Sequence, residues 1–103
     1  MTTLGGRVLV VDDDSALRTV VREALRRAGY NVETAASVAE QRRLFTSFDP
    51  QVLVTDVVLP DGNGLDIIPE ILAKSPNLPI IVLSAQNTFT TALRATEQGA
   101  FDY

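Results

Sequence analysis

The stretch RVLVVDDD, residues 7–14, places a short, largely apolar run directly before three consecutive aspartates. We expect residues 7–11 to form a buried strand. The segment after the aspartates carries apolar residues at the spacing of one helix face, which we expect to be buried: Leu17, Val20, Val21, Ala24, Leu25 and Ala28. Gly29 can adopt the conformation that ends such a helix. A buried strand and an amphipathic helix therefore open the chain.

The same alternation of strand and helix continues along the sequence. Ser37 and Glu40 have the spacing of a capping box, so a second helix should begin there and end before Asp49-Pro50. Pro69 fits a third helix that begins near Asp66, because the amide it lacks is not needed in a first helical turn. Further strands are expected at 30–34, 51–55 and 80–83, a fourth helix at 88–98, and the opening of a fifth strand at 100–103. Apolar strands separated by helices predict an α/β fold with a doubly wound parallel sheet.

The composition narrows the class of protein. A length of 103 residues, 46% of them hydrophobic, predicts one domain spanning residues 1–103. The chain has no cysteine and no histidine, so a metal site must use oxygen ligands. A net charge of -4 argues against direct contact with nucleic acid. No apolar run is long enough to cross a membrane, and we expect a cytoplasmic protein.

Oxygen-bearing side chains follow three of the predicted strands. Asp12 and Asp13 come after the first strand, Asp56 after the third and Ser84 after the fourth. In doubly wound sheets, ligands bind at this carboxyl edge. If the first and third strands are neighbours, their carboxylates can approach to about 5 Å and repel by roughly 3 kcal/mol at an effective dielectric constant of about 20. Mg²⁺, a hard cation that prefers oxygen ligands, would relieve that repulsion.

Each of these residues also has a simpler interpretation. The three aspartates could form a polar turn, with Asp14 or Ser15 capping the next helix. Asp56 alone could be a solvated loop residue. An aspartate, any residue, aspartate pattern after the first strand also occurs in magnesium phosphohydrolases of the haloacid dehalogenase type, with Asp12 as nucleophile. The common register of Asp13, Asp56 and Ser84 favours a shared site.

Several motifs resemble those of response-regulator receiver (CheY-like) domains in order and spacing. They are Val10-Val11-Asp12-Asp13, Asp56 followed by Leu59-Pro60 and Gly64, and Ser84-Ala85. The stretch QGAFDY, residues 98–103, is similar to the segment that enters the fifth strand of NtrC-type two-component transcriptional regulators. The resemblance covers essentially the whole chain. It implies a flavodoxin/CheY-like fold with strand order 2-1-3-4-5.

The resemblance also implies a role for the aspartates. Asp56 would be the phosphoacceptor, taking a phosphoryl group from a sensor histidine kinase. Asp13 would bind Mg²⁺ directly together with Asp56 and the backbone carbonyl of Val58, and Asp12 would act through water. Such a domain is a phosphorylation switch and not a metabolic enzyme.

Two further residues would transmit the effect of phosphorylation at Asp56 to the surface of the domain. The resemblance implies that Ser84 hydrogen-bonds a phosphoryl oxygen and that its movement draws Tyr103 inward, which alters the surface near the fifth strand. In the full-length protein, this event would control ATPase and DNA-binding domains that follow the receiver.

One departure from the family concerns the end of the sequence. Receivers of this type carry a lysine on the fifth strand that pairs with the phosphoryl group, followed by a proline and a fifth helix. This sequence ends near the start of that strand, so we expect a C-terminally truncated receiver that lacks helix 5, exposes apolar surface beside the first helix and self-associates as a homodimer. The alternative function is an interaction or dimerisation module that works without phosphate.

Overall fold

The computed structural model describes residues 6–83 and 99. Four strands form one parallel sheet in the order β2-β1-β3-β6: β1 (Arg7–Val11), β2 (Asn31–Ala35), β3 (Val52–Asp56) and β6 (Ile80–Leu83). β6 is the predicted fourth strand, so the doubly wound fold and the predicted order of four strands are confirmed. The predicted helix at 88–98, the fifth strand at 100–103, Ser84 and Tyr103 lie outside the described residues.

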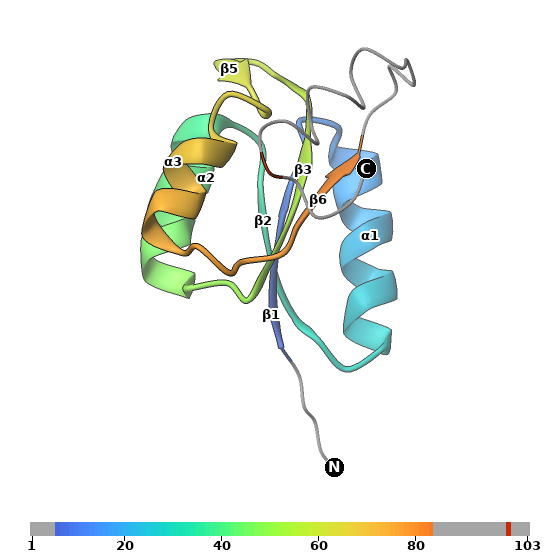
Figure 1. Cartoon of the computed structure of the whole chain (residues 1–103). Coiled ribbons are helices and arrows are strands. Elements are labelled where there is room, and N and C mark those ends of the chain that lie inside the picture. The colour runs from blue at the N-terminus through green and yellow to red at the C-terminus, as the bar shows by residue number, and fades with distance from the viewer. Residues whose placement is uncertain (1–5, 84–98, 100–103) are drawn as a thin grey trace.

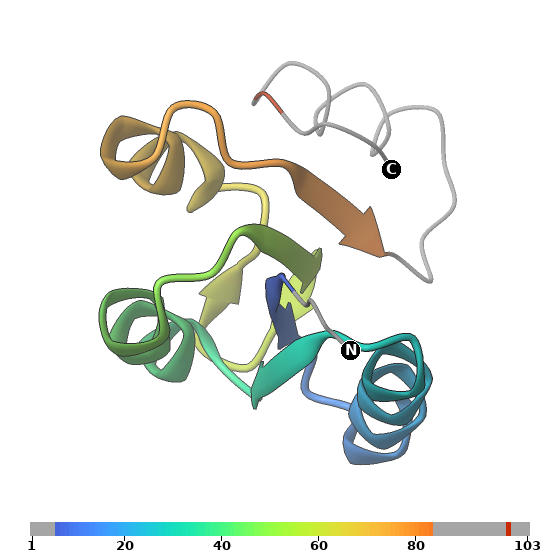
Figure 2. The same cartoon turned by 90° about the horizontal axis from the view of Figure 1, so that it is seen from below.

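Helices pack on both faces of the sheet. α2 (Val38–Phe48) and α3 (Ile68–Lys74) lie on one face, and α1 (Ser15–Arg27) lies on the other (Figures 1 and 2). A hairpin of two short strands, β4 (Val58–Leu59) and β5 (Gly62–Asn63), follows β3. Within the described ranges, no helix has the length and apolar character needed to cross a membrane.

The alternating side chains of each strand divide the core in two. Val8 and Val10 of β1 point towards α1, where they pack with Val32 and Val54. Leu9, the next residue of the same strand, belongs to the larger cluster under α2 and α3, whose other members are Val11, Ala35, Val38, Phe45, Leu53, Val57, Leu59, Leu65, Ile67, Ile68, Ile71, Ile80 and Val82. The sheet is therefore buried more completely on the α2 and α3 side.

The prediction of a buried face on α1 is wrong. No residue of this helix is buried, and Leu17 and Val20 are 39% and 64% exposed. Val21 and Leu25 are partly buried against the valines of β1, β2 and β3. The part of the apolar stripe that contains Val21 and Leu25 packs on the sheet, and the part that contains Leu17 and Val20 stays in contact with solvent. Periodicity gives the direction of a stripe but not the area of its partner.

The predicted helix starts are confirmed for α1 and α2. Asp14 caps α1 by accepting hydrogen bonds from the amides of Ala16 and Leu17, and Ser37 caps α2 by accepting from the amide of Glu40. The Glu40 carboxylate accepts from the amide of Ala36, one residue before the cap, at 2.7 Å. The cap at the start of α2 therefore spans one residue more than the predicted capping box.

Three elements have boundaries that differ from the prediction. β2 and β3 each begin and end one residue later than expected. α3 begins at Ile68 and not at Asp66, because the preceding turn is held by Asn63, whose side chain accepts from the amide of Leu65 and whose carbonyl accepts from the amide of Asp66. Pro69 still lies at the start of the helix, where its missing amide costs little.

Candidate functional site

The register of the sheet brings the predicted acidic residues to one edge. β1 and β3 pair in parallel with Val11 opposite Thr55, so Asp12 and Asp56 follow as neighbours. Asp56 is also opposite Leu83 of β6, the residue that precedes Ser84. The edge is therefore built from β1 and β3, and Ser84 itself lies outside the described residues.

Asp12 is held in place by its own backbone and by α1. Its amide donates to the Ala35 carbonyl at 3.0 Å, and its Oδ1 accepts from the amide of Asp14 at 2.9 Å. The Arg18 guanidinium donates to the Asp12 carbonyl at 2.7 Å. Asp12 is 3% exposed, whereas its neighbour Asp13 is exposed. The first carboxylate is thus fixed in the wall of the site and the second reaches solvent.

Asp56 ends β3 and is half-buried. Its Oδ1 accepts from the amide of Val57 at 2.7 Å, and its carbonyl accepts from the Thr55 hydroxyl at 3.1 Å. Burial raises the pKa of Asp56, the Val57 hydrogen bond partly opposes that change, and the charges of Asp12 and Asp13 raise the pKa further. The surroundings therefore disfavour an unneutralised charge on Asp56.

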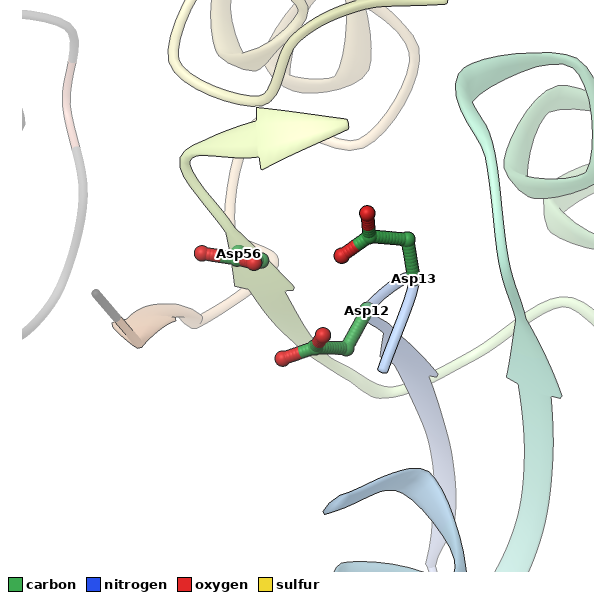
Figure 3. Close-up of side chains that lie close together, drawn as sticks. All are labelled: Asp12, Asp13 and Asp56. Carbon is green, nitrogen blue, oxygen red and sulfur yellow. The ribbon is translucent and has the colours of Figure 1, made fainter. Parts of the chain in front are cut away.

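The carboxylates of Asp12, Asp13 and Asp56 point towards one another (Figure 3), and one oxygen of each lies within 4.8 Å of the others. At that separation two unit charges repel by roughly 3 kcal/mol at an effective dielectric constant of about 20. The donors are all hard oxygens, and the exposure of Asp13 leaves room for water ligands. This donor set fits Mg²⁺, which binds one or two carboxylates and keeps several waters.

The backbone after Asp56 folds closely against it. Gly64 is buried, and its amide donates to the Val57 carbonyl at 2.6 Å. A Cβ atom on Gly64 would overlap the carbonyl oxygen of Asp56. The hairpin of β4 and β5 joins these two residues, so the loop returns to the site where it began. Val58, the predicted carbonyl ligand, is the first residue of that hairpin.

Sequence reasoning missed several residues that shape this edge. Gly64 stood in a recognised motif, but its close approach to Asp56 could not be deduced from the motif. Nothing in the sequence indicates that the Arg18 guanidinium reaches the Asp12 backbone. The sequence likewise gives no sign that Asp61 caps α2 from the hairpin. Ser84 and Tyr103, which we did predict, lie outside the described residues.

A carboxylate cluster at the carboxyl edge of a doubly wound parallel sheet is the arrangement that the resemblance to receiver domains predicts. The family model described as response regulator receiver domain matches residues 8–103, and the chain belongs to that family. It is 50% identical over 99 residues to the DNA-binding transcriptional regulator NtrC of Rhizobium meliloti (strain 1021), an alignment that covers 96% of this chain and 20% of that protein. The chain thus corresponds to the receiver domain of NtrC-type response regulators and spans about a fifth of the length of these curated relatives.

Solved structures agree with this assignment. The non-phosphorylated HemR receiver domain from Leptospira biflexa has a TM-score of 0.87 and 36% identity, covering 94% of this chain and 78% of that one. A response regulator from Burkholderia pseudomallei, solved with a phosphorylated aspartic acid, calcium ion and citrate, has a TM-score of 0.89 and 28% identity, covering 95% of this chain and 58% of that one. Receiver domains are phosphorylation switches that bind Mg²⁺ at an acidic pocket, and Asp12, Asp13 and Asp56 form an acidic cluster in this chain.

The Asp13→Asn variant should have opposite effects on stability with and without Mg²⁺. Without the ion, removing one charge relieves repulsion, and we expect the free energy of unfolding to rise by about 1 kcal/mol, because the exposure of Asp13 screens the full interaction. With Mg²⁺, the wild type should gain stability from binding and the variant should gain much less. Thermal unfolding at several Mg²⁺ concentrations measures both effects. A variant that matches the wild type at every Mg²⁺ concentration would remove Asp13 from the site.

Proposed function

We propose that residues 1–103 are the phosphoacceptor unit of an NtrC-type response regulator, and that Asp56 takes a phosphoryl group from a phosphohistidine of a sensor histidine kinase. The observation that carries this proposal is the cluster of Asp12, Asp13 and Asp56, in which Asp56 lies at the end of a central strand and contacts solvent. The phosphorylated aspartic acid and calcium ion of the Burkholderia pseudomallei regulator support it.

The chemistry follows from the hydrogen bonds of Asp56. Because Oδ1 accepts from the Val57 amide, we assign the attack on phosphorus to Oδ2. A bond from Oδ2 to phosphorus forms, the bond from the histidine nitrogen to phosphorus breaks, and its electron pair stays on the imidazole. The nucleophile must be ionised. Because the pKa of Asp56 is raised, the reaction requires a positive charge nearby that stabilises the ionised carboxylate.

The metal would be held by Asp13, Asp56 and the backbone carbonyl of Val58, with Asp12 acting through water. When bound, Mg²⁺ supplies positive charge that offsets the charge on the transferring oxygens. The Asp12 carboxylate is buried and fixed by the Asp14 amide, which suits a residue that orients ligands around the ion. The exposed carboxylate of Asp13 suits direct contact with an ion that enters from solvent.

The signal would pass from Asp56 to residues beyond β6. We assign the hydrogen bond to the phosphoryl oxygen to Ser84, which follows Leu83 directly, and the inward movement to Tyr103. The curated relatives are DNA-binding transcriptional regulators much longer than this chain, so ATPase and DNA-binding domains following the receiver belong to this proposal. Self-association as a homodimer stays a prediction.

Phosphotransfer from a histidine kinase tests the proposal. A sensor kinase labelled with radioactive phosphate on its histidine is mixed with the chain and Mg²⁺. The label should move to the chain and be released by hydroxylamine, which cleaves an acyl phosphate but not a phosphoserine. Label that stays on the kinase, or that resists hydroxylamine once transferred, would exclude Asp56 as the acceptor.

A further inference from the structure

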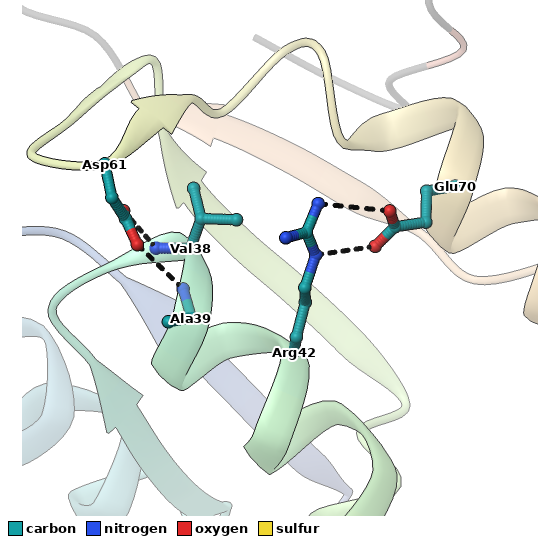
Figure 4. A network of polar contacts seen from close by, with 5 residues as sticks. All are labelled: Val38, Ala39, Arg42, Asp61 and Glu70. Atoms are coloured by element: carbon teal, nitrogen blue, oxygen red, sulfur yellow. Dashed lines mark hydrogen bonds and ion pairs between the residues drawn. The ribbon is translucent and has the colours of Figure 1, made fainter.

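Asp61 links the loop after the phosphoacceptor to a helix far away in the sequence. Its carboxylate accepts hydrogen bonds from the amides of Val38 at 2.7 Å and Ala39 at 3.0 Å (Figure 4). These amides belong to the first turn of α2, where backbone donors have no partner within the helix. The two hydrogen bonds lower the pKa of Asp61, because they stabilise the ionised carboxylate.

The contact with α2 also holds the tip of the hairpin, because Asp61 lies at that tip. Pro60 and Asp61 form the turn between β4 and β5. In these two strands, Val58 pairs with Asn63 and Leu59 pairs with Gly62. The base of the hairpin is held at Asp56 by the close approach of Gly64. Asp61 holds the opposite end, so the hairpin is fixed at both its base and its tip.

Val58 lies between these two points, where it pairs with Asn63 and its side chain adds little packing. Its side chain is 54% exposed, so side-chain packing does not fix the backbone whose carbonyl is assigned to the metal. The tip, in contrast, packs closely on the helix, because a Cβ atom on Gly62 would lie 3.1 Å from the Val38 side chain. The attachment of the tip to α2 therefore limits how far the Val58 carbonyl can move.

The helix to which Asp61 is hydrogen-bonded, α2, is held in place by other contacts. Arg42 of α2 forms two hydrogen bonds with the Glu70 carboxylate of α3, at 3.1 and 3.2 Å (Figure 4). Val38 and Phe45 of α2 are buried in the core. Loss of the Asp61 carboxylate would thus release the tip of the hairpin while α2 stays on the sheet.

We propose that Asp61 is a positioning residue for the metal site, which holds the backbone carbonyl of Val58 in place by tying the tip of the β4–β5 hairpin to the first turn of α2. The inference rests on the proposed function, because it requires Val58 to be a metal ligand. Asp61 does not touch the ion or the phosphoryl group. It acts through the hairpin, as outer partners of metal ligands do.

Mg²⁺ affinity tests this role, with Ser37→Ala as a matched control. Ser37 caps the same helix end by accepting from the Glu40 amide, and among the described residues its side chain forms no hydrogen bond with the hairpin. Calorimetric titration with MgCl₂, at a temperature where every variant is fully folded, should show about tenfold weaker binding for Asp61→Ala and unchanged binding for Ser37→Ala. Asp61→Asn, which keeps only one acceptor oxygen, should bind Mg²⁺ with intermediate affinity.

The outcomes separate this inference from the proposed function. If Asp61→Ala binds Mg²⁺ as tightly as the wild type, or if Asp61→Ala and Ser37→Ala lose the same Mg²⁺ affinity, Asp61 is only a helix cap. Neither result would contradict the proposed function. A wild-type chain that binds no Mg²⁺ would overturn both. If Asp61→Ala does not fold, the comparison of Asp61→Asn with Ser37→Ala decides the question by the same criterion.

Discussion

The Gly64→Ala variant is expected to lose about 3 kcal/mol of folding free energy, at the upper end of the usual cost of overpacking a tight site. The added methyl group would overlap the carbonyl oxygen of Asp56, which is backbone and cannot rotate away. Gly64 must therefore move outward, which would break its 2.6 Å hydrogen bond to Val57 and shift the phosphoacceptor. Chemical denaturation measures the loss of stability, and Mg²⁺ titration should show a parallel loss of affinity.

Gly62→Ala is the matched control for this variant. It lies in the same hairpin, but the nearest neighbour of an added Cβ atom is a methyl group of the Val38 side chain, 3.1 Å away, and a shift of a few tenths of an ångström relieves that contact. We expect it to cost less than about 1 kcal/mol. Equal effects of the two substitutions would show that the approach of Gly64 to Asp56 does not determine the stability of the loop.

The Asp56→Asn variant is expected to take no phosphoryl group, because a neutral amide is not the nucleophile that a carboxylate is. The same variant should be more stable than the wild type at neutral pH without Mg²⁺. The raised pKa of Asp56 means that its ionised form opposes folding, so the wild type loses stability as the pH rises through that pKa, and the asparagine variant does not. The difference in stability should vanish below the usual pKa range of an aspartate.

Intact mass after treatment with acetyl phosphate, and unfolding curves across acidic pH, measure these two effects. Asp66→Asn is a suitable control, since Asp66 is exposed in the turn before α3. It should be phosphorylated to the same extent as the wild type. Full phosphorylation of the Asp56→Asn variant would place the acceptor elsewhere in the chain.

Much of the sheet could be predicted because its signals are local. The run at 7–11 matches β1, Ser37 is the predicted cap of α2, and Asp14 is one of the two predicted caps of α1. Each of these signals depends on residues that lie close together in the sequence. The carboxyl-edge cluster could be anticipated for a related reason. Once strands are parallel, residues that follow neighbouring strands must meet, whatever the lengths of the helices between them.

The errors and omissions concern contacts between distant segments. Pro69 allows a helix to start at either Asp66 or Ile68, and only the turn held by Asn63 selects the later start. Val20 is exposed although it lies on the apolar face of α1, and its helical spacing does not show this. Asp61 gives no local sign that its partners are 22 and 23 residues away. These features depend on tertiary packing, which periodicity does not describe.

The most direct test of the account is to locate the phosphoryl group after treatment of the chain with acetyl phosphate, with and without Mg²⁺. Trypsin cleavage after Arg43 and Lys74 gives one peptide that contains Asp56 together with Asp49, Asp61 and Asp66, so fragment masses must separate the four. The account predicts a single phosphoryl group, on Asp56, that forms only when Mg²⁺ is present. A phosphoryl group on another residue, or none with Mg²⁺ present, would contradict it, and the second result would favour an interaction module that works without phosphate.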